Sequence, residues 1–327
     1  MPGRIDWENQ IGKRLRLRDL HVFSTVVRLG SMGKAALELG VSQPAVSEII
    51  ADLEHAVGVR LFDRTPRGVE TTAEGSSLER HVLAAFDELK QGIKDIEFLS
   101  DPTIGEVRIG CPESISAAIL QPICETFTQQ YPRVVLDVDT VNTLSFAQRL
   151  RDRNLDVVLA RGGWPLEDEQ LVSDFNVETF YHDELVIAAG CQSRWARRRK
   201  IDISELCDEQ WILTSGDRLN YQIIIGAFRR RGIEMPKICM KTISVHLRAS
   251  MVATGRFVTT FPRSVLDLHA DRLGLKMLPI DLPNANWPVK IATLRNRSMS
   301  AVVKRFIACA GETAKSAPDR KRAHESK

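Results

Sequence analysis

Six cysteines are the side chains of this sequence best suited to nucleophilic or metal chemistry: Cys111, Cys124, Cys191, Cys207, Cys239 and Cys309. None belongs to a C-x-x-C pair, and no histidine stands at zinc-finger spacing from two of them. The first residues lack the apolar run of an export signal, so we expect reduced, mostly buried thiols. The spacing therefore predicts no metal site.

The motifs of common catalytic sites are absent from the sequence as well. It contains no G-x-S-x-G elbow, no P-loop, no H-E-x-x-H and no G-x-G-x-x-G after a strand. Cys111, close to Ser114, is the one candidate nucleophile, and nothing in the sequence fixes a base beside it. We therefore predict no catalytic residues, no cofactor and no enzymatic activity.

A short polar segment, SQPAVSE at residues 42–48, is suited to reading base edges in DNA. Gln43 can hydrogen-bond adenine through both amide atoms, and Ala45 can contact a thymine methyl group. Ser42 and Ser47 suit phosphates. Glu48 repels phosphate but can accept a hydrogen bond from cytosine N4, or else faces solvent. This chemistry requires the segment to begin an exposed helix.

The surrounding pattern predicts such a helix. From residue 17 onward, apolar residues recur at helical spacing, with breaks at Gly30 and Gly40. Ser42 is an N-cap candidate, and Pro44 is tolerated in the first turn. About three residues separate the second and third helices, as in a helix-turn-helix motif.

A β-hairpin is expected directly after these helices. In VRLFDRTPRGVETT, two apolar-rich segments flank a turn signal at residues 65–68. Such a hairpin forms a wing, in which Arg64 and Arg67 are positioned to reach phosphate or the minor groove.

A long helix is expected over residues 73–100. Thr71-x-x-Glu74 predicts a capping box at its start, and apolar residues keep a spacing of three to four as far as Ile96. An apolar stripe of this length needs a second helix or another apolar surface to pack against. We favour a dimerisation helix over packing against the chain's own residues.

From Gly105 the pattern alternates between strand-like and helical runs, which predicts α/β units with a mostly parallel sheet. Residues 1–16 are expected to form a polar leader, and residues 311–327 a disordered tail.

With these pieces in order, the chain resembles the LysR-type transcriptional regulators over residues 17–310. The resemblance is strongest from Phe23 to Gly75. There a Ser-Gln-Pro-Ala-Val-Ser run is followed by Leu-Glu, Gly, Leu-Phe-x-Arg and Thr-x-x-Gly. Further on, Arg108-Ile109-Gly110, Tyr131-Pro132, Leu155-Asp156 and Phe261-Pro262 match pieces of the family's effector domain.

The resemblance implies the fold and the domains. Residues 17–72 form a winged helix-turn-helix, and residues 73–100 a linker helix that dimerises the protein. Residues 105–310 form a two-lobed, doubly wound α/β effector domain built like a type 2 periplasmic binding protein. Lobe one then takes about 105–178 and 283–310, and lobe two about 179–282, with crossovers near 179–183 and 278–282.

The resemblance also points to particular residues. Gln43, Pro44 and Ser47 match positions where the family contacts DNA. Ligands of such α/β domains bind beyond the carboxyl ends of strands, near helix N-termini. The candidate effector residues there are Ser114, Ser116, Thr143, Arg161, Thr214 and Ser215. His246 is interpreted as structural.

Charge supports DNA binding only weakly. The net charge is +3 for the 327 residues, and residues 1–72 carry ten lysines and arginines against nine acidic residues. Useful affinity therefore requires dimers or tetramers on paired half-sites. No stretch approaches the ~20 apolar residues of a membrane span, so we expect a cytoplasmic protein.

The combined prediction is a ligand-responsive regulator of promoter DNA that changes DNA bending and the recruitment of RNA polymerase. Arg161 and the helix N-termini favour an organic acid as effector, although a sugar or an aromatic compound also fits a hydroxyl-rich site. Two alternatives stay open: a constitutive DNA binder without a ligand, and a small-molecule enzyme fused to a winged helix.

Overall fold

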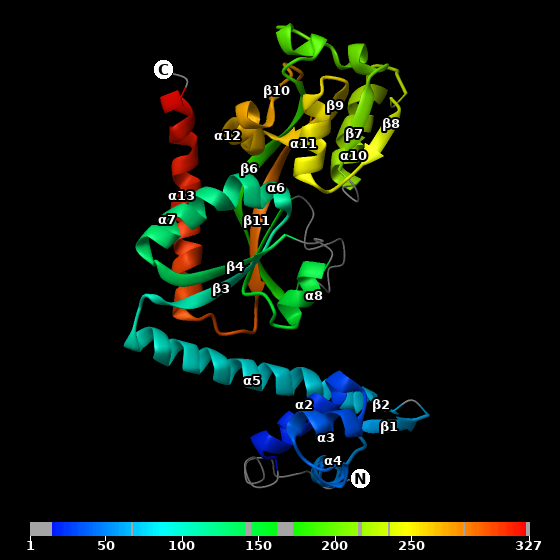
Figure 1. Cartoon of the computed structure of the whole chain (residues 1–327), viewed down its shortest axis with the longest axis vertical. Coiled ribbons are helices and arrows are strands. Elements are labelled where there is room, and N and C mark those ends of the chain that lie inside the picture. The colour runs from blue at the N-terminus through cyan, green and yellow to red at the C-terminus, as the bar shows by residue number, and fades with distance from the viewer. Residues whose placement is uncertain are drawn as a thin grey trace. The chain divides into compact units, whose positions relative to one another are not determined.

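The chain divides into two units, Met1–Gly92 and Ile93–Lys327. The computed structural model (Figure 1) describes residues 15–66, 68–140, 145–161, 173–214, 218–234, 236–283 and 285–324, with the backbone alone at 218–219 and 315–324. None of the helices described is both long and apolar enough to cross a membrane.

The described part of the N-terminal unit begins with the helices α2 (Leu17–Leu29), α3 (Met32–Leu39) and α4 (Gln43–Val57). α2 ends at Gly30, whose φ of 61° costs glycine no strain. Ser31 and Ser42 begin the next two helices. Each of these side chains accepts a hydrogen bond of 3.3 Å from the backbone N–H three residues later. The helix-turn-helix prediction is thus confirmed.

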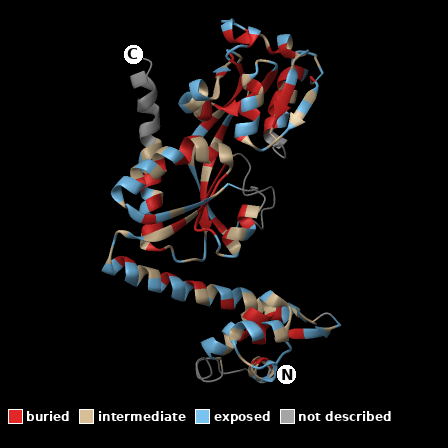
Figure 2. Cartoon of the chain, in the orientation of Figure 1, coloured by how far each residue is buried: buried red, intermediate tan, exposed pale blue. Residues whose placement is uncertain are grey.

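The core of this unit consists of apolar side chains from all three helices. Phe23 and Val26 of α2 meet Val46, Ile50 and Leu53 of α4, and all five are buried. Each contributes about 1.5–3 kcal/mol of burial free energy. Figure 2 colours the buried segments of the chain red. Since the three α4 residues recur at helical spacing, the opposite face of α4 is left to solvent.

The wing is an antiparallel pair of strands, β1 (Phe62–Thr65) and β2 (Gly68–Thr71), with Thr65 opposite Gly68. Its position depends on α4, because the Glu54 carboxylate accepts hydrogen bonds from the backbone N–H groups of Leu61 (2.7 Å) and Phe62 (3.2 Å). The predicted hairpin is confirmed.

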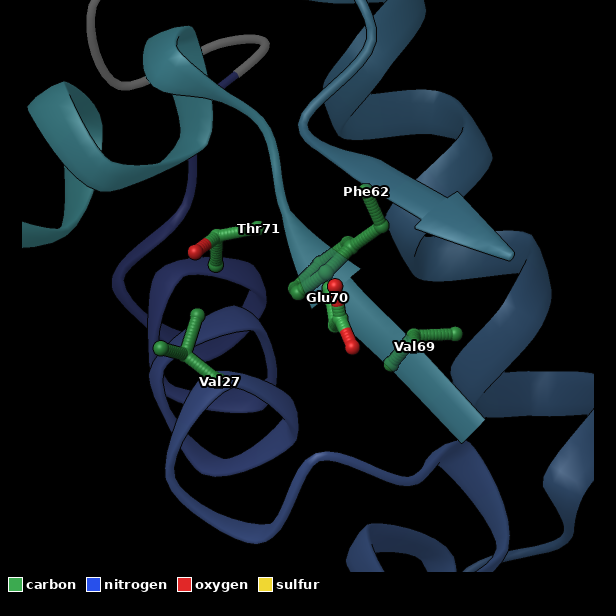
Figure 3. A pocket seen from close by; sticks show the side chains of 5 residues that line it. All are labelled: Val27, Phe62, Val69, Glu70 and Thr71. Carbon is green, nitrogen blue, oxygen red and sulfur yellow. The ribbon is translucent and has the colours of Figure 1, made fainter. Parts of the chain in front are cut away.

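A hollow lies between α2 and the wing (Figure 3). It is lined by Val27, Phe62, Val69, Glu70 and Thr71. None of these residues was predicted to bind a ligand, and the hollow belongs wholly to the N-terminal unit.

The long helix α5 (Ala73–Ser100) occupies the predicted residues, but the predicted capping box at Thr71 is wrong. Thr71 is still part of β2, opposite Phe62. Thr72 caps the helix instead, because its hydroxyl accepts a 3.0 Å hydrogen bond from the Gly75 N–H.

The described residues of the second unit form a nine-stranded sheet in the order β4-β3-β5-β11-β6-β9-β7-β8, with β10 beside β6. The strands are β3 (Ile104–Gly110), β4 (Arg133–Asp139), β5 (Val157–Arg161), β6 (Phe175–Gly190), β7 (Gln210–Leu213), β8 (Ile238–Lys241), β9 (Phe257–Pro262), β10 (Leu275–Met277) and β11 (Asn286–Leu294).

Strand β6 belongs to both halves of this sheet. Up to Glu184 it pairs with β11, and from Leu185 it pairs with β9. We call the half with β3, β4, β5 and β11 lobe one, and the half with β7 to β10 lobe two. The change of partner falls just beyond the crossover expected at residues 179–183.

The expectation of a mostly parallel sheet is wrong, because the sheet is mixed. β3 pairs in parallel with β4 and β5, and β7 with β8 and β9. β6 and β11, which carry the chain between the lobes and back, make antiparallel pairs, and β10 pairs antiparallel with the lobe-two end of β6. Local periodicity does not report the direction in which such a returning strand runs.

Helices cover the sheet. They are α6 (Glu113–Ile115), η1 (Ser116–Leu120), α7 (Gln121–Gln130), α8 (Phe146–Arg151), η3 (Arg194–Arg197), η4 (Ile203–Leu206), α10 (Arg218–Arg229), α11 (Val245–Ala253), α12 (Arg263–Leu273) and α13 (Ala301–His324). α13 runs through residues 311–324, where composition predicts disorder. Alanines, which favour helix, recur at positions 308, 310, 314 and 317.

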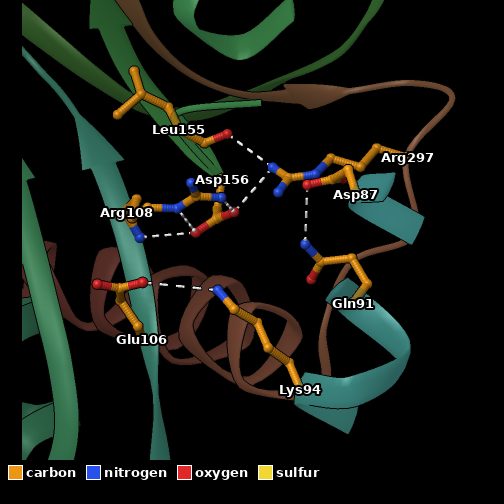
Figure 4. Close-up of polar contacts among 8 residues, drawn as sticks. All are labelled: Asp87, Gln91, Lys94, Glu106, Arg108, Leu155, Asp156 and Arg297. Atoms are coloured by element: carbon orange, nitrogen blue, oxygen red, sulfur yellow. Dashed lines mark hydrogen bonds and ion pairs between the residues drawn. The ribbon is translucent and has the colours of Figure 1, made fainter. Parts of the chain in front are cut away.

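A buried ionic cluster ties lobe one together (Figure 4). Asp156, 5% exposed, accepts hydrogen bonds from the Arg108 side chain at 2.8 and 3.1 Å, and Arg297 Nη1 lies 2.9 Å away. Burial by itself raises the pKa of this carboxyl. The hydrogen bonds from Arg108 and the charges of both arginines outweigh burial, so that the pKa is lowered overall.

We expect Asp156→Asn to lower the free energy of unfolding by about 3 kcal/mol, since it leaves two arginines without their buried counter-ion. Because the pKa is lowered in the folded protein, the stabilisation is present above the unfolded-state pKa of about 3.9 and is lost as the pH falls below it.

Urea titrations at pH 7 and at pH 3 measure this. The difference between wild type and variant should shrink at pH 3, while the exposed Asp152→Asn control should change little. An equal difference at both pH values would contradict the charge-based explanation.

Candidate nucleic-acid interface and interlobe site

The start of α4 presents the predicted base-reading residues. Ser42, Gln43, Pro44 and Glu48 are exposed, and Ala45 and Ser47 are half-buried. Two of them also hold local structure: the Ser42 side chain caps α4, and the Ser47 hydroxyl contacts Met32 Sδ at 4.0 Å. Gln43 and Glu48 are therefore the side chains best placed to meet a base edge.

The wing presents Arg64, whose side chain is exposed on β1. Arg67, the other predicted wing contact, lies outside the described residues. Because Glu54 connects the wing to α4, Arg64 keeps its position relative to the exposed start of that helix.

In the second unit, Arg161 and Ser114 come together as the end of β5 meets the residues after β3. Arg161 Nη1 donates to Ser114 Oγ at 2.6 Å, and Nη2 donates to Asp183 Oδ2 at 2.8 Å. The Arg161 side chain is 11% exposed and that of Asp183 1%. Arg161 is therefore already paired with a carboxylate of its own chain.

Asp183 joins both lobes. Besides Arg161 of lobe one, it accepts hydrogen bonds from the Ser264 hydroxyl (2.6 Å) and the Ser264 N–H (3.2 Å) of α12. The Glu184 N–H is a further donor, at 2.9 Å. Sequence reasoning missed Asp183, because its role appears only when β6 is seen to change partners beside it.

The other predicted effector residues lie elsewhere or are not described. Ser116 donates to the carbonyl of Glu113 within its own turn, at 2.9 Å. The Thr214 hydroxyl accepts a hydrogen bond from Arg248. Thr143 and Ser215 lie outside the described residues. His246 is exposed at the start of α11.

Arg248 is a buried cation that sequence reasoning missed. It is 2% exposed, and its guanidinium carbon lies 4.4 Å from the centroid of the Phe261 ring. A signal existed, because Val245, Arg248 and Val252 share one helix face, and two of the three are apolar core residues.

The one candidate nucleophile is inert. Cys111 is fully buried, and burial, with a smaller contribution from Cys124, raises the pKa of its thiol to about 12. At neutral pH the group is protonated, and it is the thiolate that reacts. Within the described part of the chain, no three histidine, cysteine, aspartate or glutamate residues cluster as metal ligands.

Two protein-family models together match most of the chain. Residues 17–76 match the bacterial regulatory helix-turn-helix protein, lysR family, and residues 100–315 match the LysR substrate binding domain.

Among curated proteins, the HTH-type transcriptional regulator TdcA of Escherichia coli is 31% identical over 247 residues, which are 76% of this chain and 77% of that protein. The HTH-type transcriptional regulator GbpR of Azospirillum brasilense is 27% identical over 88% of this chain and 83% of its own.

Solved structures share the fold. A full-length OxyR variant from Pseudomonas aeruginosa has a TM-score of 0.62 at 19% identity, covering 92% of this chain and 95% of that one. Full-length CbnR in complex with its target DNA has a TM-score of 0.53 at 18% identity, covering 92% of this chain and all of that one.

We expect a thiol reagent such as a maleimide to label the exposed Cys191 and Cys239 of the native protein and to leave Cys111 unlabelled until denaturant is added. Peptide mass mapping after timed labelling measures this. Rapid labelling of Cys111 in native protein would show that its thiol is reactive.

Proposed function

Because the chain belongs to the LysR family of DNA-binding transcriptional regulators, which are not enzymes, we propose that it binds paired half-sites in promoter DNA and responds to a small-molecule effector. The observation that carries this proposal is the exposed start of α4, held on a buried helix-turn-helix core beside an anchored wing. Its side chains have the chemistry of major-groove readout.

In this proposal, Gln43 reads a base, Ala45 contacts a thymine methyl and Ser47 contacts phosphate. Ser42 and Pro44 hold the helix start against the DNA backbone, and Glu48 adjusts base preference. Arg64 and Arg67 of the wing contact backbone phosphate or the minor groove.

The regulator acts as a dimer through α5, and as a tetramer on paired half-sites. Supporting this, an apolar stripe along α5 is exposed in the single chain: Leu89, Ile93, Ile96 and Leu99. Their spacing of three to four residues fits a second helix. The small positive charge of residues 1–72 makes multivalent binding necessary for useful affinity.

The effector is proposed to be an organic acid that binds between the lobes, near Ser114 and Arg161, with Thr143, Ser116, Thr214 and Ser215 as further contacts. Since Asp183 already pairs with Arg161, such an acid must exchange with or share this ion pair. Its binding would alter DNA bending and RNA polymerase recruitment in the cytoplasm, through unequal affinity for two conformations.

We expect Gln43→Ala to weaken binding to operator fragments selected from random DNA by about tenfold or more, because one bidentate base contact is worth about 1–3 kcal/mol. Fluorescence anisotropy titrations measure the loss. The matched control is His55→Ala, an exposed change in the last turn of α4, which should bind like wild type.

Arg64→Ala should instead weaken selected and unrelated DNA alike and reduce the salt dependence by about one phosphate contact. A protein that binds no selected DNA in any form would overturn the proposed function.

We expect one class of small acids to raise the melting temperature of the full-length protein, since a ligand of the native state stabilises it by mass action. Ser114→Ala should weaken this binding about fivefold, the value of one hydrogen bond. Arg161→Ala also removes the counter-ion of Asp183 and should lower the melting temperature by itself. The shift caused by a ligand is therefore measured against the same variant without ligand. If no acid, sugar or aromatic compound shifts the melting temperature, the constitutive alternative gains support.

A further inference from the structure

The carboxylate of a lobe-one residue lies at the N-terminus of a helix of lobe two. Glu113, the first residue of α6, accepts a 2.7 Å hydrogen bond at Oε2 from the backbone N–H of Val245. Val245 is the first residue of α11 and stands 132 positions further along the chain. The first N–H groups of a helix have no partner within it and carry partial positive charge, which a carboxylate satisfies.

The backbone N–H groups at the start of α11 find hydrogen-bond acceptors in both lobes. Ser244, its own N-cap, accepts the Leu247 N–H at 3.2 Å, while Glu113 takes the N–H of Val245. Val245 is 6% exposed, and Glu113 is half-buried. Water therefore has restricted access to this hydrogen bond, which raises its strength relative to one on the surface.

Within the described residues, the lobes share a cluster of buried apolar side chains, to which Ile115 of α6 and Val265 of α12 belong, and further polar contacts also cross between them. Asp183 and Ser264 connect Arg161 to α12, and His269 Nε2 of α12 lies 2.6 Å from the carbonyl oxygen of Ala117. Glu113 is distinct from these, because it is a charged side chain of lobe one that engages α11. Lobe one therefore makes polar contacts with α12 and with α11, two helices that share its apolar cluster.

We propose that Glu113 is an interlobe latch: its carboxylate fixes α11 of lobe two against lobe one, and a regulatory movement of the lobes requires the release of this hydrogen bond. The proposal rests on the proposed function and deepens it, because it assigns to the two-lobed domain a contact that its regulatory movement must break.

The test is hydrogen–deuterium exchange of the full-length protein, read in peptides that cover residues 242–250 and 262–270. Glu113→Ala should speed exchange at the start of α11 about tenfold, since a hydrogen bond to a charged group contributes this much or more. Glu113→Gln keeps an oxygen acceptor without the charge and should give an intermediate rate. Glu125→Ala, an exposed change on α7 of the same lobe, is the matched control and should leave both peptides unchanged.

The second peptide separates a latch from a simple helix cap. Release of a latch loosens the contacts of α12 too, so residues 262–270 should also exchange faster in Glu113→Ala. If the start of α11 alone responds, Glu113 is a local cap and the latch is overturned. An unchanged rate in both peptides would overturn the contact itself.

Measuring operator binding by the same variants tests the proposed DNA-binding function separately from the Glu113 latch. Glu113 lies in the second unit, so its variants should bind selected DNA, whichever way exchange responds. A wild-type protein that binds no selected DNA would overturn the proposed function, whereas the exchange result would still decide whether Glu113 holds the lobes.

Discussion

The arrangement of the effector domain depends on one buried carboxylate, that of Asp183. It lies next to the point where β6 leaves β11 and pairs with β9, and it accepts four hydrogen bonds, from Arg161, from Ser264 twice and from Glu184. An ionised group with almost no exposure is tolerated only when such donors surround it. Because the donors come from both lobes, the register of β6 and the seating of α12 are determined together.

Local features of the fold could be predicted from the sequence because they have local causes. Gly30 supplies a positive φ, and Ser42 supplies an oxygen to an N–H three residues on, so both helix boundaries follow from residue type. The sequence pattern predicted the wrong N-cap of α5, where two neighbouring residues could cap the helix equally well. Thr71 and Thr72 offer the same hydroxyl, and strand pairing with Phe62 decides between them.

Residues of the interlobe site could be predicted only in part. Ser114 comes shortly after β3 and Arg161 is the last residue of β5, so their meeting follows from the parallel pairing of these two strands. Glu113 and Asp183 could not be foreseen, since their partners lie in lobe two and depend on how the chain returns. For Arg248 the signal was present, as a charge on an otherwise apolar helix face.

The anchoring of the wing by Glu54 has a consequence for operators. The Glu54 carboxylate on α4 fixes the backbone of Leu61 and Phe62, so α4 and the hairpin keep one position relative to each other. A wing held in this way cannot shift along a duplex on its own while α4 stays in place. A base pair inserted between the positions that the two elements face would therefore require the whole N-terminal unit to move.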